Sequence, residues 1–418
     1  MSHQEFYPST AGKAGLFYGY IIVLATFCIT LVAYGIRGTY GIFFNSMVTE
    51  FGWGSATVSS VFSLSVLVEG TFGVILGKMN DRFGPRLVLT LCSIFLGLGY
   101  FLMSRVSILW QMYFFYGILV GIGMGGIMVP LLSTISRWFV SRRAIMAGIG
   151  LAGTGIGSLI FSPLSEWLIS NQSWQTAYLL MGVAVLVVSI VTSQFLKRDP
   201  MLMGLTPYLN AAEKPKSMLD TLNLTLRQAV RTRPFWLVVI IMFINGYTIY
   251  SILVHLVPHV ILVGISPATA ATLMATYGIA GLVCRIIMGG LADKIGSKLV
   301  FVISFVFSSL TFLAMLFFQD VGFFYLVAIL FGLASGGILS TVAAFVAELF
   351  GLKSHGEIFG VIGFCTTIGG AVGPFLAGYL YDINGNYIMA FLICALMSIA
   401  AIVFTTLVKP VKAKESAY

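Results

Sequence analysis

Apolar runs long enough to cross a membrane recur along this chain, and they constrain its fold more than any other feature. Hydrophobic residues make up 59% of the 418 residues and charged residues only 9%, unlike a soluble globular domain. A helix of about 20 apolar residues spans the bilayer core and satisfies its own backbone hydrogen bonds there. We therefore predict an all-α integral membrane protein with twelve transmembrane helices, near residues 17–41, 56–77, 87–105, 108–135, 144–169, 174–196, 235–257, 267–291, 299–318, 322–348, 356–381 and 386–408.

The positions of the basic residues predict the orientation of these helices. Of the 23 Lys and Arg residues, all except Arg37, Arg105 and Arg285 fall on segments that share one side of the membrane with both termini. The positive-inside rule assigns that side to the cytoplasm. We expect a multi-pass protein of the cell inner (plasma) membrane with both termini cytoplasmic. The net charge of +9 then reflects orientation, and no nucleic-acid partner is expected.

Residue patterns typical of enzymes and metal sites are missing from the sequence. It contains no Ser/His/Asp set, no H-E-x-x-H and no phosphate-binding loop, so we do not expect an enzyme. The five cysteines lie within predicted spans, without disulfide or zinc spacing. No metal and no cofactor are expected.

An internal repeat divides the chain into two halves. Residues 77–86 (GKMNDRFGPR) match residues 289–298 (GGLADKIGSK) at an offset of 212. A polar, proline-containing stretch separates the two copies. We predict an N-terminal six-helix bundle over residues 1–196, a cytoplasmic linker over 197–234 with an interfacial helix from Leu222 to Arg231, and a C-terminal six-helix bundle over 235–418.

The repeated motif G-x-x-x-D-[RK]-x-G-x-[RK] after the second helix of each half resembles the signature of the major facilitator superfamily. The resemblance implies two bundles around a central cavity that rock to give alternating access. A glycine in the motif allows helices to approach closely, and each Asp can face a neighbouring helix N-terminus. The alternative interpretation is an ordinary charged turn. The motif residues in question are Gly77, Asp81, Arg82, Asp293 and Lys294.

A second motif narrows the resemblance. The stretch RWFVSRRAIMAGIGLAG, which begins at Arg137, is similar to a signature of the monocarboxylate transporter family, although Ser141, Met146 and Gly150 depart from it. The first helix has the family spacing of Gly-Tyr, Tyr and Phe-Phe. The chain resembles bacterial proton-coupled lactate transporters of that family over nearly its whole length. By this resemblance Arg142 and Arg143 join the gating motif.

Arg285 is a permanent cation inside a predicted span. It lies eight residues before Asp293, and therefore roughly 12 Å inside the end of its helix at about 1.5 Å per residue. A central arginine costs about 2.5 to 3.5 kcal/mol on insertion and is tolerated mainly where it faces a cavity or a partner. Its planar fork matches a carboxylate. We predict that Arg285 binds the substrate carboxylate; the alternative is a structural arginine paired with helix carbonyls or Glu69.

The residue that carries a coupling proton is less evident. The family resemblance implies an aspartate four residues before this arginine, but Gly281 occupies that position. Glu69 lies at the corresponding place in the other half, and a buried carboxyl can carry a proton; the alternative is a structural glutamate. His255 is a second candidate, or a merely interfacial histidine. Arg37, beside the position of the family's first-helix lysine, is either an entrance cation near the outer face or a helix cap.

Further polar residues lie on helices that line the cavity in this superfamily. They could hydrogen-bond a hydroxyl or keto oxygen of the substrate, or only pack. These candidates are Tyr34, Tyr116, Asn245, Tyr247 and Tyr250. The span over 356–381 contains no Lys or Arg, which favours one carboxylate on the substrate, unless Arg37 reaches the cavity.

The function that these features favour is transport of a small monocarboxylate, such as lactate or pyruvate, together with a proton by alternating access. The expected partners are the anion, the proton and the lipid bilayer, with the protein a monomer driven by the proton gradient. Two alternatives remain open. One is an anion exchanger without proton coupling, and the other is a transporter-like membrane sensor.

Overall fold

The computed structural model describes residues 17–139, 142–208, 224–317, 319–351 and 354–409, and the side chains of Arg143, Ala144, Asp293 and His355 lie outside that description. Over these residues the chain is almost entirely helical, and twelve helical spans are long and apolar enough to cross a membrane. The predicted fold class and number of spans are confirmed. The first predicted span is too short, because the helix resumes after a break and the span extends from Tyr18 to Phe51.

The N-terminal half contains six spans, two of them built from several helical segments. The first span breaks at Gly38 and Thr39, and the fourth contains a π-helical stretch. The segments are α1 (Tyr18–Arg37), α2 (Tyr40–Phe51), α3 (Ser55–Phe83), α4 (Pro85–Met103), α5 (Leu109–Met112), η1 (Tyr113–Val120), α6 (Gly121–Gly125), α7 (Met128–Trp138), α8 (Arg143–Asn171) and α9 (Trp174–Ser193).

The C-terminal half contains the other six spans. They are α11 (Arg233–Leu262), α12 (Pro267–Ile295), α13 (Ser297–Phe317), α14 (Val321–Phe350), α15 (His355–Asn384) and α16 (Ile388–Leu407). Between the halves lie η2 (Pro200–Met203) and the short α10 (Leu226–Ala229). The interfacial helix predicted from Leu222 to Arg231 corresponds to α10 where the structure describes it, and residues 209–223 lie outside the description.

Glycine explains the sharp turns inside both copies of the repeated motif. Gly84 joins α3 to α4 with φ 84°, and Gly296 joins α12 to α13 with φ 85°. An L side chain rarely adopts this conformation, so glycine is the residue that suits the turn. In the first copy Pro85 then begins α4, where its missing N–H would have no helical partner. The repeat in sequence is therefore a repeat in backbone geometry.

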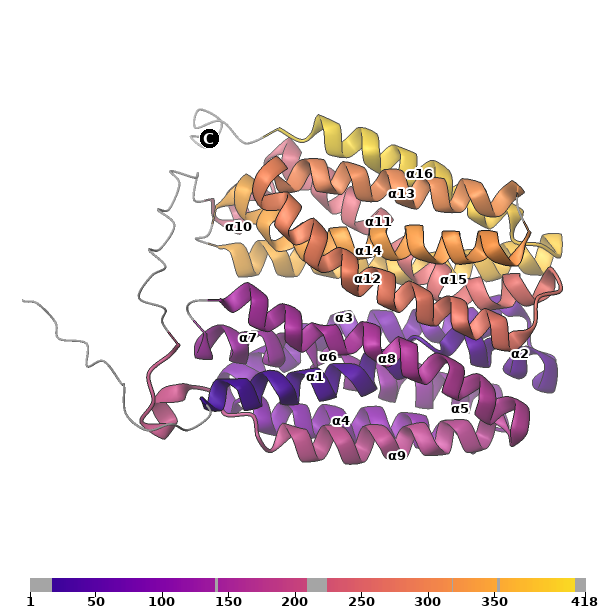
Figure 1. Ribbon diagram of the computed structural model, residues 1–418, viewed down its shortest axis with the longest axis horizontal. Coiled ribbons are helices and arrows are strands. Elements are labelled where there is room, and N and C mark those ends of the chain that lie inside the picture. The colour runs from indigo at the N-terminus through magenta and orange to yellow at the C-terminus, as the bar shows by residue number, and fades with distance from the viewer. Residues whose placement is uncertain (1–16, 140–141, 209–223, 318, 352–353, 410–418) are drawn as a thin grey trace, which may run out of the picture.

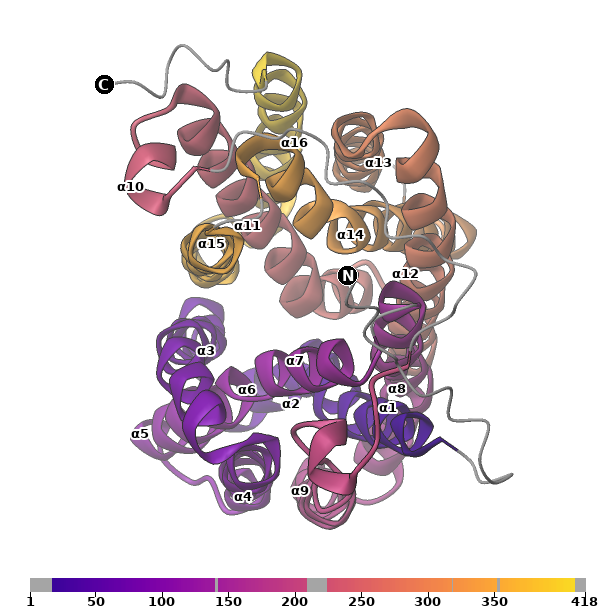
Figure 2. The ribbon, with the colours of Figure 1, turned by 90° about the vertical axis from the view of Figure 1, so that its left-hand side faces the viewer.

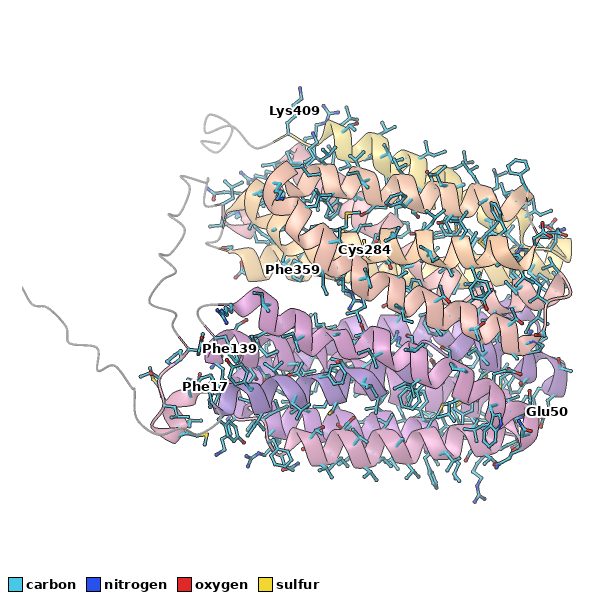
Figure 3. The ribbon with its side chains drawn as sticks, in the orientation of Figure 1. Phe17, Glu50, Phe139, Cys284, Phe359 and Lys409 are labelled. Carbon is cyan, nitrogen blue, oxygen red and sulfur yellow. The ribbon has the colours of Figure 1, made fainter. Side chains whose placement is uncertain are left out.

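The two halves lie against each other, one below and one above in Figure 1. The linker segments η2 and α10, the start of α1 and the end of α16 lie at one end of the bundle, which we call the linker end. Lys409 lies at this end and Glu50 at the opposite one, the far end (Figure 3). Seen from the linker end, α3 lies beside α15, and α8 beside α12 (Figure 2).

Contacts between the halves are concentrated at the far end and the middle. At the far end, a Cβ built on Gly41 of α2 would lie 2.9 Å from the carbonyl oxygen of Leu253 in α11. In the middle, a Cβ on Gly155 of α8 would lie 2.6 Å from the carbonyl oxygen of Gly278 in α12. These helices touch through their backbones, so nothing larger than glycine fits.

Toward the linker end, α8, α12 and α15 carry glycines without close neighbours. A Cβ on Gly148 of α8, on Gly290 of α12, or on Gly356, Gly360 and Gly363 of α15 would meet no atom of the described residues within 4 Å. The structure is therefore closed at the far end and separated at the linker end along α8, α12 and α15.

Candidate functional site

An ion pair inside the N-terminal half forms the first part of the site. Arg37, at the end of α1, places Nη1 2.7 Å from Oε2 of Glu69 in α3. The Arg37 side chain is 3% exposed and the Glu69 side chain 16%. Arg37 is thus neither near the outer face nor a cap, because the chain continues into α2 and buries the end of α1 in the bundle. Each charge offsets much of the other's desolvation cost.

Two aromatic rings lie near the Arg37 guanidinium, whose nitrogens find few hydrogen-bond acceptors among the described residues. Within the described residues, Nε and Nη2 of Arg37 have no hydrogen-bond partner. The guanidinium carbon lies 5.3 Å from the ring centre of Phe62 and 5.7 Å from that of Tyr250. Ring faces attract a cation, more so in a site without water. Because Tyr250 belongs to α11, this contact joins the two halves.

Arg285 forms the second part of the site and also joins the halves. Its Nη1 donates to Oγ1 of Thr154 at 2.8 Å and to the carbonyl oxygen of Leu151 at 3.3 Å, both in α8. Its Nε has no partner among the described residues. The guanidinium therefore uses one terminal nitrogen for α8 and keeps an edge for another acceptor. Figure 3 shows Cys284, its neighbour in sequence, part-way along the bundle.

Tyr34 connects these two parts. It lies on α1, one turn before Arg37. Its side chain is close enough to Arg37, Glu69 and Arg285 to interact electrostatically with all three. Tyr277 interacts electrostatically with Tyr250 and with Arg285. We call Arg37, Glu69, Tyr34, Tyr250 and Arg285 the central cluster. Both halves contribute to it, and it carries two cations and one acid.

Two further predicted residues can be placed relative to the central cluster. Tyr116 is buried in the N-terminal half against Tyr40, Phe62 and Tyr100, and it lies close enough to Arg37 to interact with its charge. Asn245 lies within the C-terminal half, among residues of α11, α13 and α14 that include Ser308 and Ser335.

His255 is fully buried toward the far end. Its Nε2 lies 3.2 Å from Oγ of Ser59 and 2.9 Å from the carbonyl oxygen of Pro374, and its Nδ1 lies 3.2 Å from the Tyr387 hydroxyl. None of these contacts is with Arg37, Glu69 or Arg285.

The gating-motif residues lie at the linker end. Asp81 is largely exposed, with Oδ1 3.7 Å from Nη2 of Arg137, and Arg82 lies over the Phe83 ring. A Cβ on Gly77 would be 3.8 Å from Val129 in α7, which is an ordinary contact. Arg142, with φ 60°, precedes α8, and Lys294 is exposed near the end of α12. The Asp293 and Arg143 side chains lie outside the described structure.

Three residues that contribute to the site or to the contact between the halves were not predicted from the sequence. Tyr277 lies eight residues before Arg285, which is a helical spacing that could have revealed it. Thr154, the Arg285 partner, has no distinctive sequence signal. Asp382 of α15 accepts hydrogen bonds from the backbone N–H groups of Ser55 and Ala56 at the start of α3. A carboxylate near the end of a predicted span gave no hint that its partner is in the other half.

Comparison with known proteins identifies the family. The model for the Major Facilitator Superfamily matches residues 26–265 and 261–417. Monocarboxylate transporter 13 of Rattus norvegicus is 30% identical over 392 residues, which cover 92% of this chain and 87% of that protein. Monocarboxylate transporter 11 of Homo sapiens is 26% identical over 399 residues, covering 92% of this chain and 82% of that protein.

A solved structure agrees in fold. It is a bacterial homologue of the human lysosomal transporter Spinster in an inward-facing, occupied conformation, and it superposes with a TM-score of 0.70 at 14% identity, covering 96% of this chain and 99% of that chain. The chain, with its two packed six-span halves, therefore belongs to the major facilitator superfamily and, within it, to the monocarboxylate transporters, so it is a multi-pass membrane transporter and not an enzyme.

Proposed function

We propose that this transporter moves a small monocarboxylate such as lactate or pyruvate together with a proton, and that Arg285 binds the carboxylate. The observation that carries the proposal is the unused edge of the Arg285 guanidinium. Nη1 is held by α8, whereas Nε has no partner among the described residues. A guanidinium edge binds a carboxylate through two parallel hydrogen bonds.

The charges in the central cluster favour one carboxylate on the substrate. Arg37 would provide a second anion site if it were free, but Glu69 neutralises it. One net positive charge, that of Arg285, then remains for the substrate. The names of the related monocarboxylate transporters support the same substrate class.

Glu69 is the proton carrier in this proposal, and the ion pair gives it a means of coupling. The empty cluster holds Arg37, Glu69 and Arg285, with one net positive charge. A proton on Glu69 alone would leave two unpaired cations, whereas an anion alone would pair with Arg285 and make the cluster neutral. Proton and anion together restore the net charge of the empty state. In this proposal the conformational change takes place at the net charge that the empty and the fully loaded carrier share, so a carrier that holds only the proton or only the anion changes conformation slowly.

The linker end faces the cytoplasm in this proposal, with both termini on that side of the inner membrane. Its basic residues support this assignment through the positive-inside rule. The structure, closed at the far end, then corresponds to a carrier accessible from the cytoplasm.

Transport by the purified protein in proteoliposomes tests the proposal. We expect uptake of radiolabelled L-lactate under an inward proton gradient, abolished by a protonophore. Arg285→Gln should lower uptake by about thirtyfold or more, because a buried charge partner is worth about 2 kcal/mol or more. Arg227→Gln, at an exposed position at the linker end, is the control. Normal uptake by Arg285→Gln would contradict the role of Arg285.

Anion exchange is the second candidate function. The Arg37–Glu69 ion pair favours it, because a glutamate already held by an arginine could stay ionised throughout the cycle. Exchange predicts uptake that survives the protonophore and requires unlabelled anion inside the vesicle. The same proteoliposomes therefore distinguish the two functions.

A further inference from the structure

A groove at the linker end lies outside the central cluster and on the lipid-facing side of the N-terminal half. It runs between the beginning of α4 and the end of α9, which are both peripheral helices (Figure 2). Its volume is about 710 Å³. The cations Arg86, Lys197 and Arg198 line it together with the apolar Leu87, Leu91 and Leu202.

The three cations are not neutralised within the groove. No ion pair of Arg86 occurs among the described residues. Lys197 places Nζ 5.1 Å from the Tyr18 ring centre, and Nε1 of Trp138 donates to its carbonyl oxygen at 2.8 Å, which fixes its backbone. Arg198 is the one with an acid nearby: its Nε lies 3.5 Å from Asp199, which is shared with Arg137 at 3.4 Å. The groove keeps a net positive charge.

The other half of the molecule provides an internal comparison. Lys298, at the start of α13, occupies the position of Arg86 in the repeat. Its Nζ donates to the carbonyl oxygens of Thr406 and Val408 at the end of α16, at 2.9 and 2.8 Å. There the basic residue caps the neighbouring peripheral helix. Arg86 makes no such bond to α9, so its charge is available to an external group.

The apolar side of the groove indicates what kind of anion it fits. Leu87 is 46% exposed, Leu91 37% and Leu202 73%. Leu91 lies about one turn deeper along α4 than Arg86, on the way to the membrane interior. A small soluble anion would gain nothing from this surface. A phospholipid has both a charged part and an apolar part. Its phosphate can lie at the level of the cations and its acyl chains along the leucines.

We propose that this groove binds the headgroup of an anionic phospholipid from the leaflet at the linker end. Its phosphate contacts Arg86, Lys197 and Arg198, and an acyl chain lies along Leu87 and Leu91. Basic pockets between transmembrane helices at the interface bind such headgroups. The proposal does not depend on which substrate the carrier moves.

Native mass spectrometry of the purified full-length protein tests it, with dioleoylphosphatidylglycerol as the probe and dioleoylphosphatidylcholine as the neutral lipid. The groove variant is Arg86→Gln/Lys197→Gln/Arg198→Gln. The control variant, Arg227→Gln/Arg233→Gln/Lys409→Gln, removes three exposed cations from the same end. We expect wild type and control to retain phosphatidylglycerol over phosphatidylcholine. The groove variant should bind it at least tenfold more weakly, because each basic residue contributes about a fivefold effect.

Equal loss in both triple variants, or in neither, would overturn the proposal. Unfolding temperatures without added lipid show whether each variant folds. If the triple groove variant does not fold, Arg86→Gln alone replaces it, with an expected fivefold effect on lipid binding. Soluble glycerol 1-phosphate forms a further arm. If it displaces phosphatidylglycerol at similar concentrations, the groove is a site for a soluble anion and the lipid assignment is wrong; if it does not, the assignment stands.

Discussion

The carboxylate of Asp382 accepts a hydrogen bond from the backbone N–H of Ser55 at 2.8 Å, across the boundary between the two halves. Ala56 donates to the same carboxylate, also at 2.8 Å. One turn further along α3, Ser59 meets His255. An acid of α15 thus caps α3, where the partial positive charge of the helix N-terminus favours an anion. These contacts close the far end and must break when it opens.

Removing this cap should make the far end open more often. Ser63 lies one turn after Ser59, on the same side of α3. We expect Asp382→Asn to increase labelling of a cysteine placed at Ser63 by about fivefold, since a helix cap contributes about 1 kcal/mol. Reaction with a membrane-impermeant maleimide in a cysteine-free background measures it. Asp320→Asn is the matched control, because Asp320 precedes α14 and its side chain makes no cap hydrogen bond. Unchanged labelling in Asp382→Asn would show that the cap does not hold the far end closed.

The Arg37–Glu69 ion pair predicts unequal effects of removing either partner. Arg37→Gln leaves a glutamate that can take up a proton, whereas Glu69→Gln leaves a buried arginine that cannot lose one. We expect Glu69→Gln to destabilise the protein more than Arg37→Gln does. It should lower the free energy of unfolding by about 3 kcal/mol or more, and added lactate should restore part of that loss. Thermal unfolding with and without lactate measures both effects. The double variant Arg37→Gln/Glu69→Gln is the control and should be less destabilised than Glu69→Gln; equal loss would mean that the pairing is unimportant.

Gly281 offers a way to move the proton carrier. A Cβ built there would lie 3.5 Å from its nearest neighbour, the carbonyl oxygen of Gly332, so a small side chain fits. An aspartate at 281 would face Arg285 one helical turn later. We expect Glu69→Gln to lose proton-driven lactate uptake and Glu69→Gln/Gly281→Asp to regain part of it. Glu69→Gln/Gly281→Asn controls for size. Regain by both double variants would contradict a proton role for the new carboxyl.

Packing between α11 and α15 predicts a large effect of a single methyl group. A Cβ on Gly246 would collide with the carbonyl oxygen of Thr366. We expect Gly246→Ala to lower the free energy of unfolding by about 1 to 3 kcal/mol, as overpacking does. The methyl group of Gly360→Ala on α15 would meet no described atom within 4 Å, so this change should be neutral or stabilising by about 0.5 kcal/mol. Denaturation in detergent compares the two; similar stabilities would contradict the packing.

Much of the fold is readable from the sequence because its physics is local. Twelve apolar runs predict twelve spans, and the repeated motif glycines recur as turns at Gly84 and Gly296 with the same positive φ. Arg285 stands out because an arginine inside an apolar run needs a reason to be there. These signals require no knowledge of long-range contacts.

The rest of the site depends on contacts that no local pattern encodes. Arg37 stands next to Gly38 and looks like the end of a helix, but α2 continues the span and buries it against Glu69. The partners of Arg285 and Asp382 lie across the boundary between the halves, in α8 and α3. Asn245 lies on a cavity-lining helix of the superfamily, yet its neighbours are residues of α13 and α14 within its own half.

The open glycines on α15 bear on the energetics of the transport cycle. Among the described residues, Gly356, Gly360 and Gly363 leave one stretch of this helix bare, whereas Gly378 of the same helix lies against Ser55 and Ser59 of α3 in the other half. Contact area that is lost when one stretch unpacks can be regained when the other packs. The two orientations of the carrier would then be close in free energy, and a modest gradient across the membrane would suffice to set the direction of turnover.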